Sequence, residues 1–230
     1  MVKTSKLLKL IQFDKSVLGS KKDHCLIGVD EVGRGALAGP VIACAFYWKV
    51  NIDEILIKYK KMFKELNDSK QLSFLERKKM YLSLCKLGNF STGHASVKEI
   101  EELNVLNATF LAMKRAFDGL KTLNNNFENF TPYLLIDGNK FNPFINAKQI
   151  SVIDGDAKSS LIAAASIIAK VYRDDLMLRL SRHTNYKKFV WDKNVGYGTL
   201  LHRKAIRKYG VTPLHRKLFV RKTLDETNSF

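Results

Sequence analysis

The sequence predicts an α/β fold in which helices flank a mixed β-sheet, followed by a basic helical C-terminal segment. Short apolar runs alternate with longer amphipathic stretches, which is typical of α/β domains. Two of these runs, at 24–30 and 132–137, end in acidic residues. The stretch 157–180 contains LIAAASIIAKV, whose many alanines indicate a helix that is buried on most sides and packed close to a sheet.

The predicted elements follow one another along the chain. Residues 1–22 form a basic amphipathic segment with apolar residues at loosely helical spacing. Ser73 can cap the next helix, and Gly119 is expected to end the one after it. The predicted strands cover residues 24–30, 40–49, 89–97, 132–137 and 147–153. The predicted helices after the first segment cover residues 73–85, 103–120, 157–180 and 202–210.

The charge of the chain predicts a polyanionic partner. Its 230 residues include 39 Lys and Arg and 22 Asp and Glu, a formal net charge of +17. Nucleic acid is the first candidate and an acidic membrane surface the second. Twelve Lys and Arg against three acids give residues 181–230 a local charge of +9. We therefore expect a basic N-terminal segment (1–22), a central α/β domain (23–180) and a basic substrate-binding segment (181–230).

Composition also excludes several classes of protein. Cys25, Cys44 and Cys85 are odd in number and widely spaced, which argues against a disulfide framework or a cysteine zinc site. The longest apolar stretch, 161–169, is less than half of a membrane span. Lysines near the N-terminus interrupt any signal-peptide core. We expect a cytoplasmic protein that does not associate with a membrane.

Acidic residues gather where predicted strands end. Asp30 and Glu31 end the first strand, and Asp137 ends a later one. Because Asp30 and Glu31 are neighbours on a strand, they face opposite sides, and one of them must be buried or bind something. Carboxylates at close range repel each other unless a cation neutralises them. Carboxylate oxygens are ligands of Mg²⁺ and Mn²⁺, and two such ions about 4 Å apart serve phosphodiester hydrolysis. An acidic cluster in a basic chain is typical of a nuclease or polymerase.

Structural roles are the alternatives for individual acids. Asp137 could be a turn residue, and Asp156 is expected to cap the long helix, a role that is compatible with metal binding. Asp154 lies in the same loop and could be the ligand instead. Asp174 and Asp175 could be solvated positions of the long helix.

The segment GVDEVGRGALAGPV (28–41) is the first of seven ordered blocks. The other six are LNDSKQLS (66–73), LNVLNATFLAMKRA (103–116), LLIDGN (134–139), GDAKSSLIAAASIIAKVYRDDLM (155–177), GYGTLLH (196–202) and GVTPLHRKLF (210–219). Together they resemble the ribonuclease HII family, the bacterial type 2 ribonucleases H, over roughly residues 24–219. One short motif could arise by chance, but seven in family order make this resemblance highly specific.

The resemblance implies a ribonuclease-H-like fold and an endonuclease that cuts the RNA strand of RNA–DNA hybrids. It also implies incision of DNA 5′ of embedded ribonucleotides, with 3′-hydroxyl and 5′-phosphate ends, in replication and ribonucleotide excision repair. The implied cofactor is Mn²⁺ or Mg²⁺, with two ions in the catalytic complex, and we expect a monomer. The family's fourth acid follows a glycine and precedes a lysine, which selects Asp156 over Asp154. The implied metal ligands and catalytic residues are Asp30, Glu31, Asp137 and Asp156.

The resemblance further implies contacts to an RNA–DNA hybrid or to duplex DNA that contains ribonucleotides. Gly33-Arg34-Gly35 is similar to a turn whose backbone contacts the ribose 2′-OH, the group that separates RNA from DNA. Tyr197 matches a tyrosine that stacks on the sugar of the following deoxynucleotide; without the motif it would be interpreted as a half-buried loop aromatic. The expected phosphate contacts are Ser69, Lys70 and Lys158, although a solvated side chain is the usual state of a lysine.

Other residues are less clearly assigned. Lys170 and Arg173 lie about one turn apart on the long helix and could support the site or contact the nucleic-acid backbone. His215 lies in a family-like block, but we assign it no chemical role. A short helix at 202–210 is expected to form a phosphate-binding surface with His202, Arg203, Lys204, Arg207 and Lys208.

Two departures from the family pattern remove no ligand: Ala36 replaces a usual proline, and Val195 replaces a frequent lysine. The sister type, ribonuclease HIII, tends to carry GKG and an extra N-terminal domain; with roughly 22 residues before the first predicted strand, we expect the HII type. One rival hypothesis is a hybrid-binding protein with a degenerate site, against which the four acids argue. Another is a DNA-directed nuclease or transposase-like protein, against which the turn and Tyr197 argue.

Overall fold

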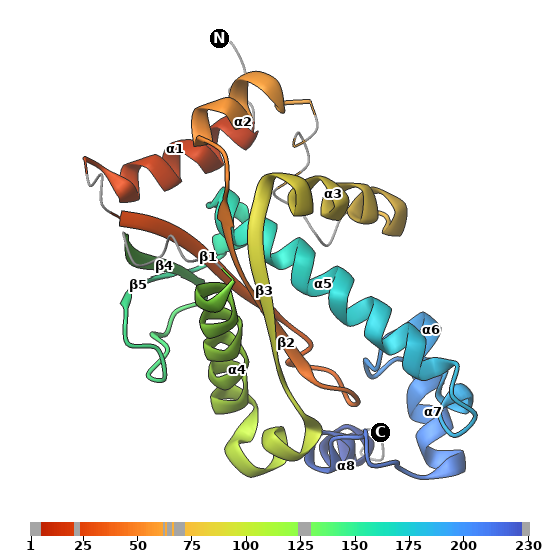
Figure 1. Cartoon of the computed structure of the whole chain (residues 1–230). Coiled ribbons are helices and arrows are strands. Elements are labelled where there is room, and N and C mark those ends of the chain that lie inside the picture. Colours follow the sequence, from red (N-terminus) through yellow and green to blue (C-terminus); the bar gives the residue numbers. More distant parts are fainter. Residues whose placement is uncertain are drawn as a thin grey trace.

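A five-stranded mixed β-sheet forms the centre of the protein (Figure 1). Its strands are β1 (His24–Val32), β2 (Val41–Trp48), β3 (Gly88–Ala95), β4 (Thr131–Asp137) and β5 (Lys148–Val152). The order across the sheet is β3-β2-β1-β4-β5, with β1, β4 and β5 parallel and β2 antiparallel to both of its neighbours. The predicted mixed sheet is therefore confirmed. The computed structural model describes residues 6–20, 24–61, 63, 66, 72–123 and 130–226.

Helices cover both faces of the sheet, and each face has its own hydrophobic core. On one face lies α4 (Val97–Thr122), packed on β1, β2 and β3. The long helix α5 (Ser160–Ser181) lies on the other face, where α1 (Lys6–Leu18), α2 (Ile52–Lys58) and α3 (Phe74–Leu87) share its core (Figure 1). The amphipathic pattern of the N-terminal residues thus corresponds to a helix that packs onto the main core.

Strand pairing brings the predicted acids to one edge of the sheet. In the parallel register of β1 and β4, Val29 lies opposite Ile136, so Asp30 and Asp137 are the next residues on two adjacent strands. Asp156 lies in a 3₁₀ turn, η2 (Gly155–Ala157), between β5 and α5. The carboxyl edge of parallel strands is where α/β proteins usually place their sites.

Two predicted helix boundaries are wrong. Asp156 does not cap α5, because η2 intervenes and the Ser159 Oγ accepts the capping hydrogen bond from the Ile162 N–H at 3.2 Å. Gly119 does not end α4, which continues beyond it. A Cβ at Gly119 would lie 2.4 Å from the Ser91 Oγ of β3, so this glycine permits close packing of the helix on the sheet.

The start of α4 also differs from the prediction, because α4 consists of two helices joined at Asn104. This residue has φ 66° and ψ 164°, outside the helical region. Its Oδ1 accepts hydrogen bonds from the N–H groups of Leu106 and Asn107 at 3.0 and 3.1 Å. Asn104 thus caps the second helix, which corresponds to the predicted helix at 103–120.

The C-terminal segment forms a third hydrophobic cluster at the C-terminal end of α5. Its elements are η3 (Lys187–Phe189), α6 (Trp191–Asn194), α7 (Leu200–Tyr209) and α8 (Lys217–Glu226). The buried Trp191 and Phe189 pack there with Met177 of α5 and with Leu37 and Ala38 from the loop after β1. This cluster attaches the basic segment to the loop that contains the Gly33-Arg34-Gly35 turn.

Within the described residues, no helix is long and apolar enough to cross a lipid bilayer. Cys25, Cys44 and Cys85 are free thiols, and Cys44 is buried in the core between the sheet and α5.

Close contact between β1 and α5 depends on Gly28. A Cβ at this position would lie 2.2 Å from the carbonyl carbon of Leu161, a backbone atom that has little room to move. We predict that Gly28→Ala lowers the free energy of unfolding by at least about 2 kcal/mol. Gly35→Ala is the matched control, because no heavy atom lies within 4 Å of its added Cβ. Urea denaturation of both variants checks this, and equal stabilities would contradict it.

Candidate active site

The four acids selected from the sequence line one cavity of about 320 Å³ at the edge of the sheet where β1 and β4 end. Strands, the η2 turn, α5 and the loop before α7 all contribute to its wall. The polar lining consists of Asp30, Glu31, Asp137, Asp156, Ser166, Lys170 and Tyr197. The structure therefore brings all four carboxylates and the predicted tyrosine together.

Burial and mutual repulsion act on the carboxylates of this cavity. Asp30 is 5% exposed, and burial, with the charges of Glu31 and Asp137, raises its pKa well above the usual range. Burial also raises the pKa of Glu31, although the Arg34 guanidinium, 3.2 Å away, opposes that shift. The Asp30 carboxylate accepts hydrogen bonds from the Glu31 N–H, at 2.7 Å, and from Ser166. A cation that binds here would relieve this repulsion.

The carboxylates share the cavity without converging on one point. Asp137 Oδ1 accepts a hydrogen bond from the Gly155 N–H at 2.7 Å, and Glu31 is paired with Arg34. Among the residues that the structure describes, no group of three or more His, Cys, Asp or Glu side chains is arranged to hold a metal ion. To hold an ion, some of these side chains must turn from their protein partners into the cavity.

Asp174, suggested as a solvated position of the long helix, is instead largely buried and paired, with its side chain 12% exposed. Its carboxylate lies 3.2 Å from Arg77 Nη1 and 2.7 Å from Lys170 Nζ. The ion pair between Asp174 and Lys170 holds the Lys170 ammonium group next to the cavity. Asp154 is exposed and precedes η2 in a left-handed conformation, with φ 53°.

The Gly33-Arg34-Gly35 turn and the Tyr197 loop are joined through their backbones. The N–H groups of Leu37 and Ala38 donate to the Gly196 carbonyl at 2.8 and 3.2 Å. The Arg216 N–H donates to the Leu37 carbonyl at 2.8 Å, and the Gly39 N–H donates to the Leu214 carbonyl at 2.9 Å. The loop after β1 is thus held on both sides by C-terminal residues.

Arg173 reinforces this junction. Its side chain is fully buried and lies against the turn, where a Cβ at Gly33 would be 2.3 Å from its Nε. Gly33 also has φ 92°, so both its conformation and its neighbour require glycine. The guanidinium lies 5.2 Å from the centre of the Tyr197 ring. It donates at 2.8–3.2 Å to the carbonyls of Ala38, Pro40 and Val195.

A second buried arginine acts in the same way. Arg216 donates to the carbonyl of Gly39 at 2.8 and 3.0 Å and to that of Arg34 at 2.8 Å. Sequence reasoning left Arg173 without a definite role and did not single out Arg216. Arginine is usually exposed, and neither position carries a local sign of burial.

Asp14 is another residue that sequence reasoning missed. It is fully buried on α1 and accepts hydrogen bonds from the Ser159 Oγ at 2.6 Å, from the Ser160 Oγ at 2.5 Å and from the Ser160 N–H at 3.0 Å. Burial raises its pKa to about 6, although these hydrogen bonds oppose the shift. Asp14 thus fixes the N-terminus of α5, close to Asp156. Its sequence signal is its place on the apolar face of the helix, one turn after Leu10.

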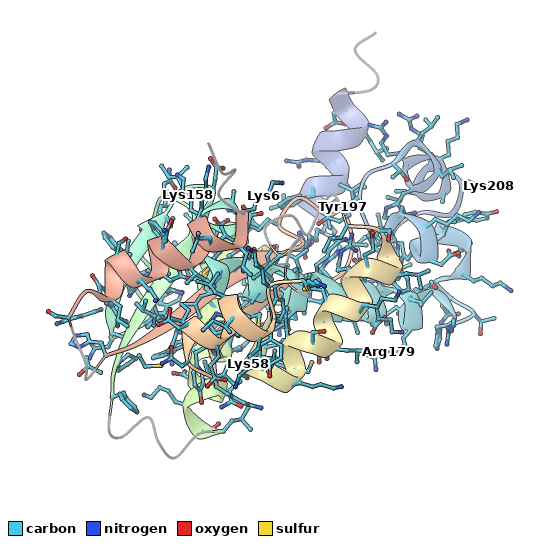
Figure 2. The ribbon with its side chains drawn as sticks, turned by 90° about the horizontal axis from the view of Figure 1, so that it is seen from above. Lys6, Lys58, Lys158, Arg179, Tyr197 and Lys208 are labelled. Carbon is cyan, nitrogen blue, oxygen red and sulfur yellow. The ribbon has the colours of Figure 1, made fainter. Side chains whose placement is uncertain are left out.

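Three predicted substrate contacts have different outcomes. Ser69 and Lys70 lie outside the described residues. Lys158 is exposed, and its Nζ donates to the Ile153 carbonyl at 2.7 Å. Seen from above, Lys158, Tyr197 and Lys208 follow one another along the long dimension of the molecule (Figure 2).

The prediction that His202 belongs to the basic surface of α7 is wrong. Its ring is 0% exposed and lies among Trp191, Phe189 and His215. The basic pattern of the helix hides the fact that one of its faces is apolar and packed. The exposed basic residues of α7 are Lys204, Arg207 and Lys208, with Arg203 partly exposed.

With this geometry established, the chain can be compared with known proteins. The model of the family described as ribonuclease HII matches residues 27–223. The chain belongs to the ribonuclease HII family. It is therefore an endonuclease with ribonuclease HII activity on RNA–DNA hybrids.

Curated ribonucleases HII resemble this one over most of their length. The enzyme of Fusobacterium nucleatum is 46% identical over 202 residues, which cover 87% of each chain. That of Ehrlichia canis is 42% identical over 208 residues, which cover 90% of each. The prediction of a bacterial ribonuclease HII is confirmed.

Solved structures confirm the ribonuclease-H-like fold. Ribonuclease H2 from Pyrococcus horikoshii has a TM-score of 0.61 at 23% identity, with 89% of this chain and 99% of that chain covered. Bst-RNase HIII, in complex with Mn²⁺, has a TM-score of 0.68 at 20% identity, with 88% and 70% covered.

Ala36, one departure from the ribonuclease HII pattern, makes a bond that the usual proline could not. Its N–H donates to the Gly33 carbonyl at 3.3 Å and closes the turn. Val195, the other, has φ 42°, which is unusual for a β-branched residue. Its carbonyl is held by Arg173.

The buried Asp14 makes stability depend on pH. The pKa of Asp14 is about 6 in the folded chain and 3.8 for an ordinary Asp side chain. Between these two pH values, Asp14 is protonated in the folded chain but ionised in the unfolded chain. The free energy of unfolding therefore falls as pH rises from about 4 to about 6, by up to about 3 kcal/mol relative to Asp14→Asn. Urea denaturation of both proteins across this range checks the prediction. A constant difference between them would contradict it.

Proposed function

We propose that this ribonuclease HII also cuts duplex DNA on the 5′ side of an embedded ribonucleotide and leaves 3′-hydroxyl and 5′-phosphate ends. The observation that carries the proposal is the single cavity that Asp30, Glu31, Asp137 and Asp156 share with Tyr197. Phosphodiester hydrolysis would then occur next to the site that recognises the sugar of the deoxynucleotide following the ribonucleotide.

The donor set of this cavity fits Mn²⁺ or Mg²⁺. Carboxylate oxygens are the ligands that these hard cations prefer. Burial, and to a smaller extent the neighbouring carboxylates, raise the pKa of Asp30 and Glu31, so a cation bound among them would favour their charged forms. A pair of divalent ions held by the four acids would activate the attacking water and stabilise the leaving 3′ oxygen. The Mn²⁺ bound to the ribonuclease HIII relative supports the same use here.

Cation binding changes the partners of the surrounding side chains. Glu31 must turn away from Arg34, whose half-exposed guanidinium is then free to contact a phosphate. Lys170 lines the same cavity and is held in place by Asp174, so its charge would lie beside a phosphate that is bound by the acids and their metal ions. Both groups would offset negative charge that develops during cleavage.

Recognition of the ribose is assigned to the Gly33-Arg34-Gly35 turn and to Tyr197. No heavy atom lies within 4 Å of where a Cβ of Gly35 would be, so a sugar can approach the backbone there. Tyr197 is partly exposed in the same cavity as the acids. Hydrogen bonds from Arg173 and Arg216 connect the loop of this turn to the segment that contains Tyr197.

Substrate binding extends along the basic C-terminal segment, residues 181–230, which we propose acts with a catalytic domain of residues 23–180. Lys204, Arg207 and Lys208 expose their charges on α7. Ser69, Lys70 and Lys158 are proposed as further phosphate contacts. We also propose that the protein acts as a monomer.

The metal role of the acids is tested by Asp30→Asn and Asp137→Asn. Each keeps the size of the side chain but loses the charge that holds a cation, so we predict at least a roughly 10³-fold loss of cleavage rate. Binding of the hybrid should remain nearly intact, because other residues contact the phosphates. Cleavage assays with Mg²⁺, Mn²⁺ or EDTA, together with binding assays, check this. Full activity of Asp30→Asn, or cleavage in excess EDTA, would contradict the mechanism.

The junction role of Tyr197 is tested by Tyr197→Ala. Loss of stacking corresponds to about 1–3 kcal/mol, and to less if the ring lies under a sugar rather than a base. We predict a larger fall in kcat/KM on a duplex with one ribonucleotide than on a continuous hybrid, with little change in stability. Equal losses on both substrates would show that Tyr197 supports only general duplex binding.

A further inference from the structure

A chain of hydrogen bonds runs through the C-terminal cluster and ends at the backbone of Tyr197. The His202 Nδ1 lies 2.9 Å from the Tyr197 carbonyl oxygen. At the other side of its ring, the His202 Nε2 lies 3.0 Å from the Trp191 Nε1 and 3.2 Å from the His215 Nε2. The His215 Nδ1, in turn, lies 2.9 Å from the Thr212 N–H nitrogen.

These contacts determine where the imidazole protons are. The Thr212 N–H and the Trp191 indole N–H can only donate, so the His215 Nδ1 and the His202 Nε2 must be acceptors. His215 therefore carries its proton on Nε2 and donates it to the His202 Nε2. His202 carries its proton on Nδ1 and donates it to the Tyr197 carbonyl. In this pair of tautomers no two donors face each other, and Trp191 and His215 share the one lone pair of the His202 Nε2.

Burial keeps both imidazoles neutral. His202 is 0% exposed and His215 is 1% exposed. Burial lowers the pKa of His202, and burial together with the neighbouring His202 lowers the pKa of His215 to about 4. Each ring accepts a hydrogen bond at one nitrogen and donates at the other, which is a role that suits neutral histidine.

The backbone around Tyr197 lacks regular secondary structure to hold it. Val195 and Gly196 have φ 42° and 84°, and α7 begins at Leu200. The Tyr197 carbonyl accepts from the Thr199 N–H at 2.8 Å as well as from His202. Val195 and Gly196 are held by Arg173 and by the loop after β1, whereas the bond from His202 ties the carbonyl of Tyr197 itself to the buried cluster.

We propose that His202 is a positioning residue for ribose recognition, and that Trp191 and His215 fix the tautomer in which it holds the Tyr197 backbone. This inference rests on the proposed role of Tyr197 at the junction. It gives a role to His202 and His215, neither of which lines the cavity of the acids.

Two substitutions at His202 separate its two hydrogen-bonding ends. The amide nitrogen of Asn can take the place of Nδ1, whereas the amide of Gln reaches the place of Nε2. His202→Asn thus keeps a donor for Tyr197 but removes the acceptor for Trp191 and His215. His202→Gln keeps that acceptor but removes the donor for Tyr197.

The measured quantity is the ratio of kcat/KM on a single-ribonucleotide duplex to that on a continuous hybrid. We expect His202→Gln to lower this ratio about tenfold, which corresponds to about 1.4 kcal/mol, and His202→Asn to leave it near the wild-type value. The free energy of unfolding should be lower in His202→Asn than in His202→Gln, because His202→Asn leaves two buried N–H groups without an acceptor. If His202→Asn, the less stable variant, also had the lower kcat/KM ratio, the inference would be overturned.

A double substitution separates this inference from the proposed function. If His202 acts through Tyr197, then adding Tyr197→Ala to His202→Gln should not lower the ratio further. Additive losses, or a fall with Tyr197→Ala but none with His202→Gln, would overturn the inference alone. An unchanged ratio in Tyr197→Ala would overturn both proposals.

The wild-type protein provides a test that does not depend on folded variants. Nitrogen-15 NMR of the imidazole rings should show an Nδ1–H tautomer for His202 and an Nε2–H tautomer for His215, both neutral at pH 7. The opposite tautomer at His202, or a charged ring there, would overturn the inference.

Discussion

Repulsion between buried carboxylates is the constraint on which the site depends. Parallel pairing of β1 with β4 places Asp30 beside Asp137, and burial removes much of the water that would screen their charges. Packing elsewhere in the sheet maintains this unfavourable arrangement. A site of this kind is suited to a divalent cation, because binding removes the repulsion that folding creates.

The helix α5 links this acidic edge to the region that recognises the sugar. Its N-terminal end is fixed by Asp14 from α1, close to Asp156, and Gly28 lets its first turn lie directly on β1. Further along, Arg173 holds the loop after β1 together with the Tyr197 segment. One rigid element therefore sets the separation between the groups proposed for cleavage and those proposed for recognition.

Sequence alone was sufficient for features with a local signal. Apolar runs that end in acids identified the two strands β1 and β4, whose parallel pairing brings those acids together. The cap of α5 was not predictable, because Asp156 and Ser159 are both good caps and the choice depends on Asp14, which is distant in sequence. His202 was misplaced for a similar reason: a basic helix suggests an exposed surface, whereas the burial of this ring depends on its packing against Trp191.

Binding of Mn²⁺ to the free enzyme, measured by electron paramagnetic resonance, tests most directly whether the buried carboxylates form the metal site. We predict saturable binding to the wild-type protein that is lost or strongly weakened in Asp30→Asn, although this variant remains folded and still binds hybrid. Binding of Mn²⁺ to Asp30→Asn with wild-type affinity would contradict the claim that the buried carboxylates form the metal site.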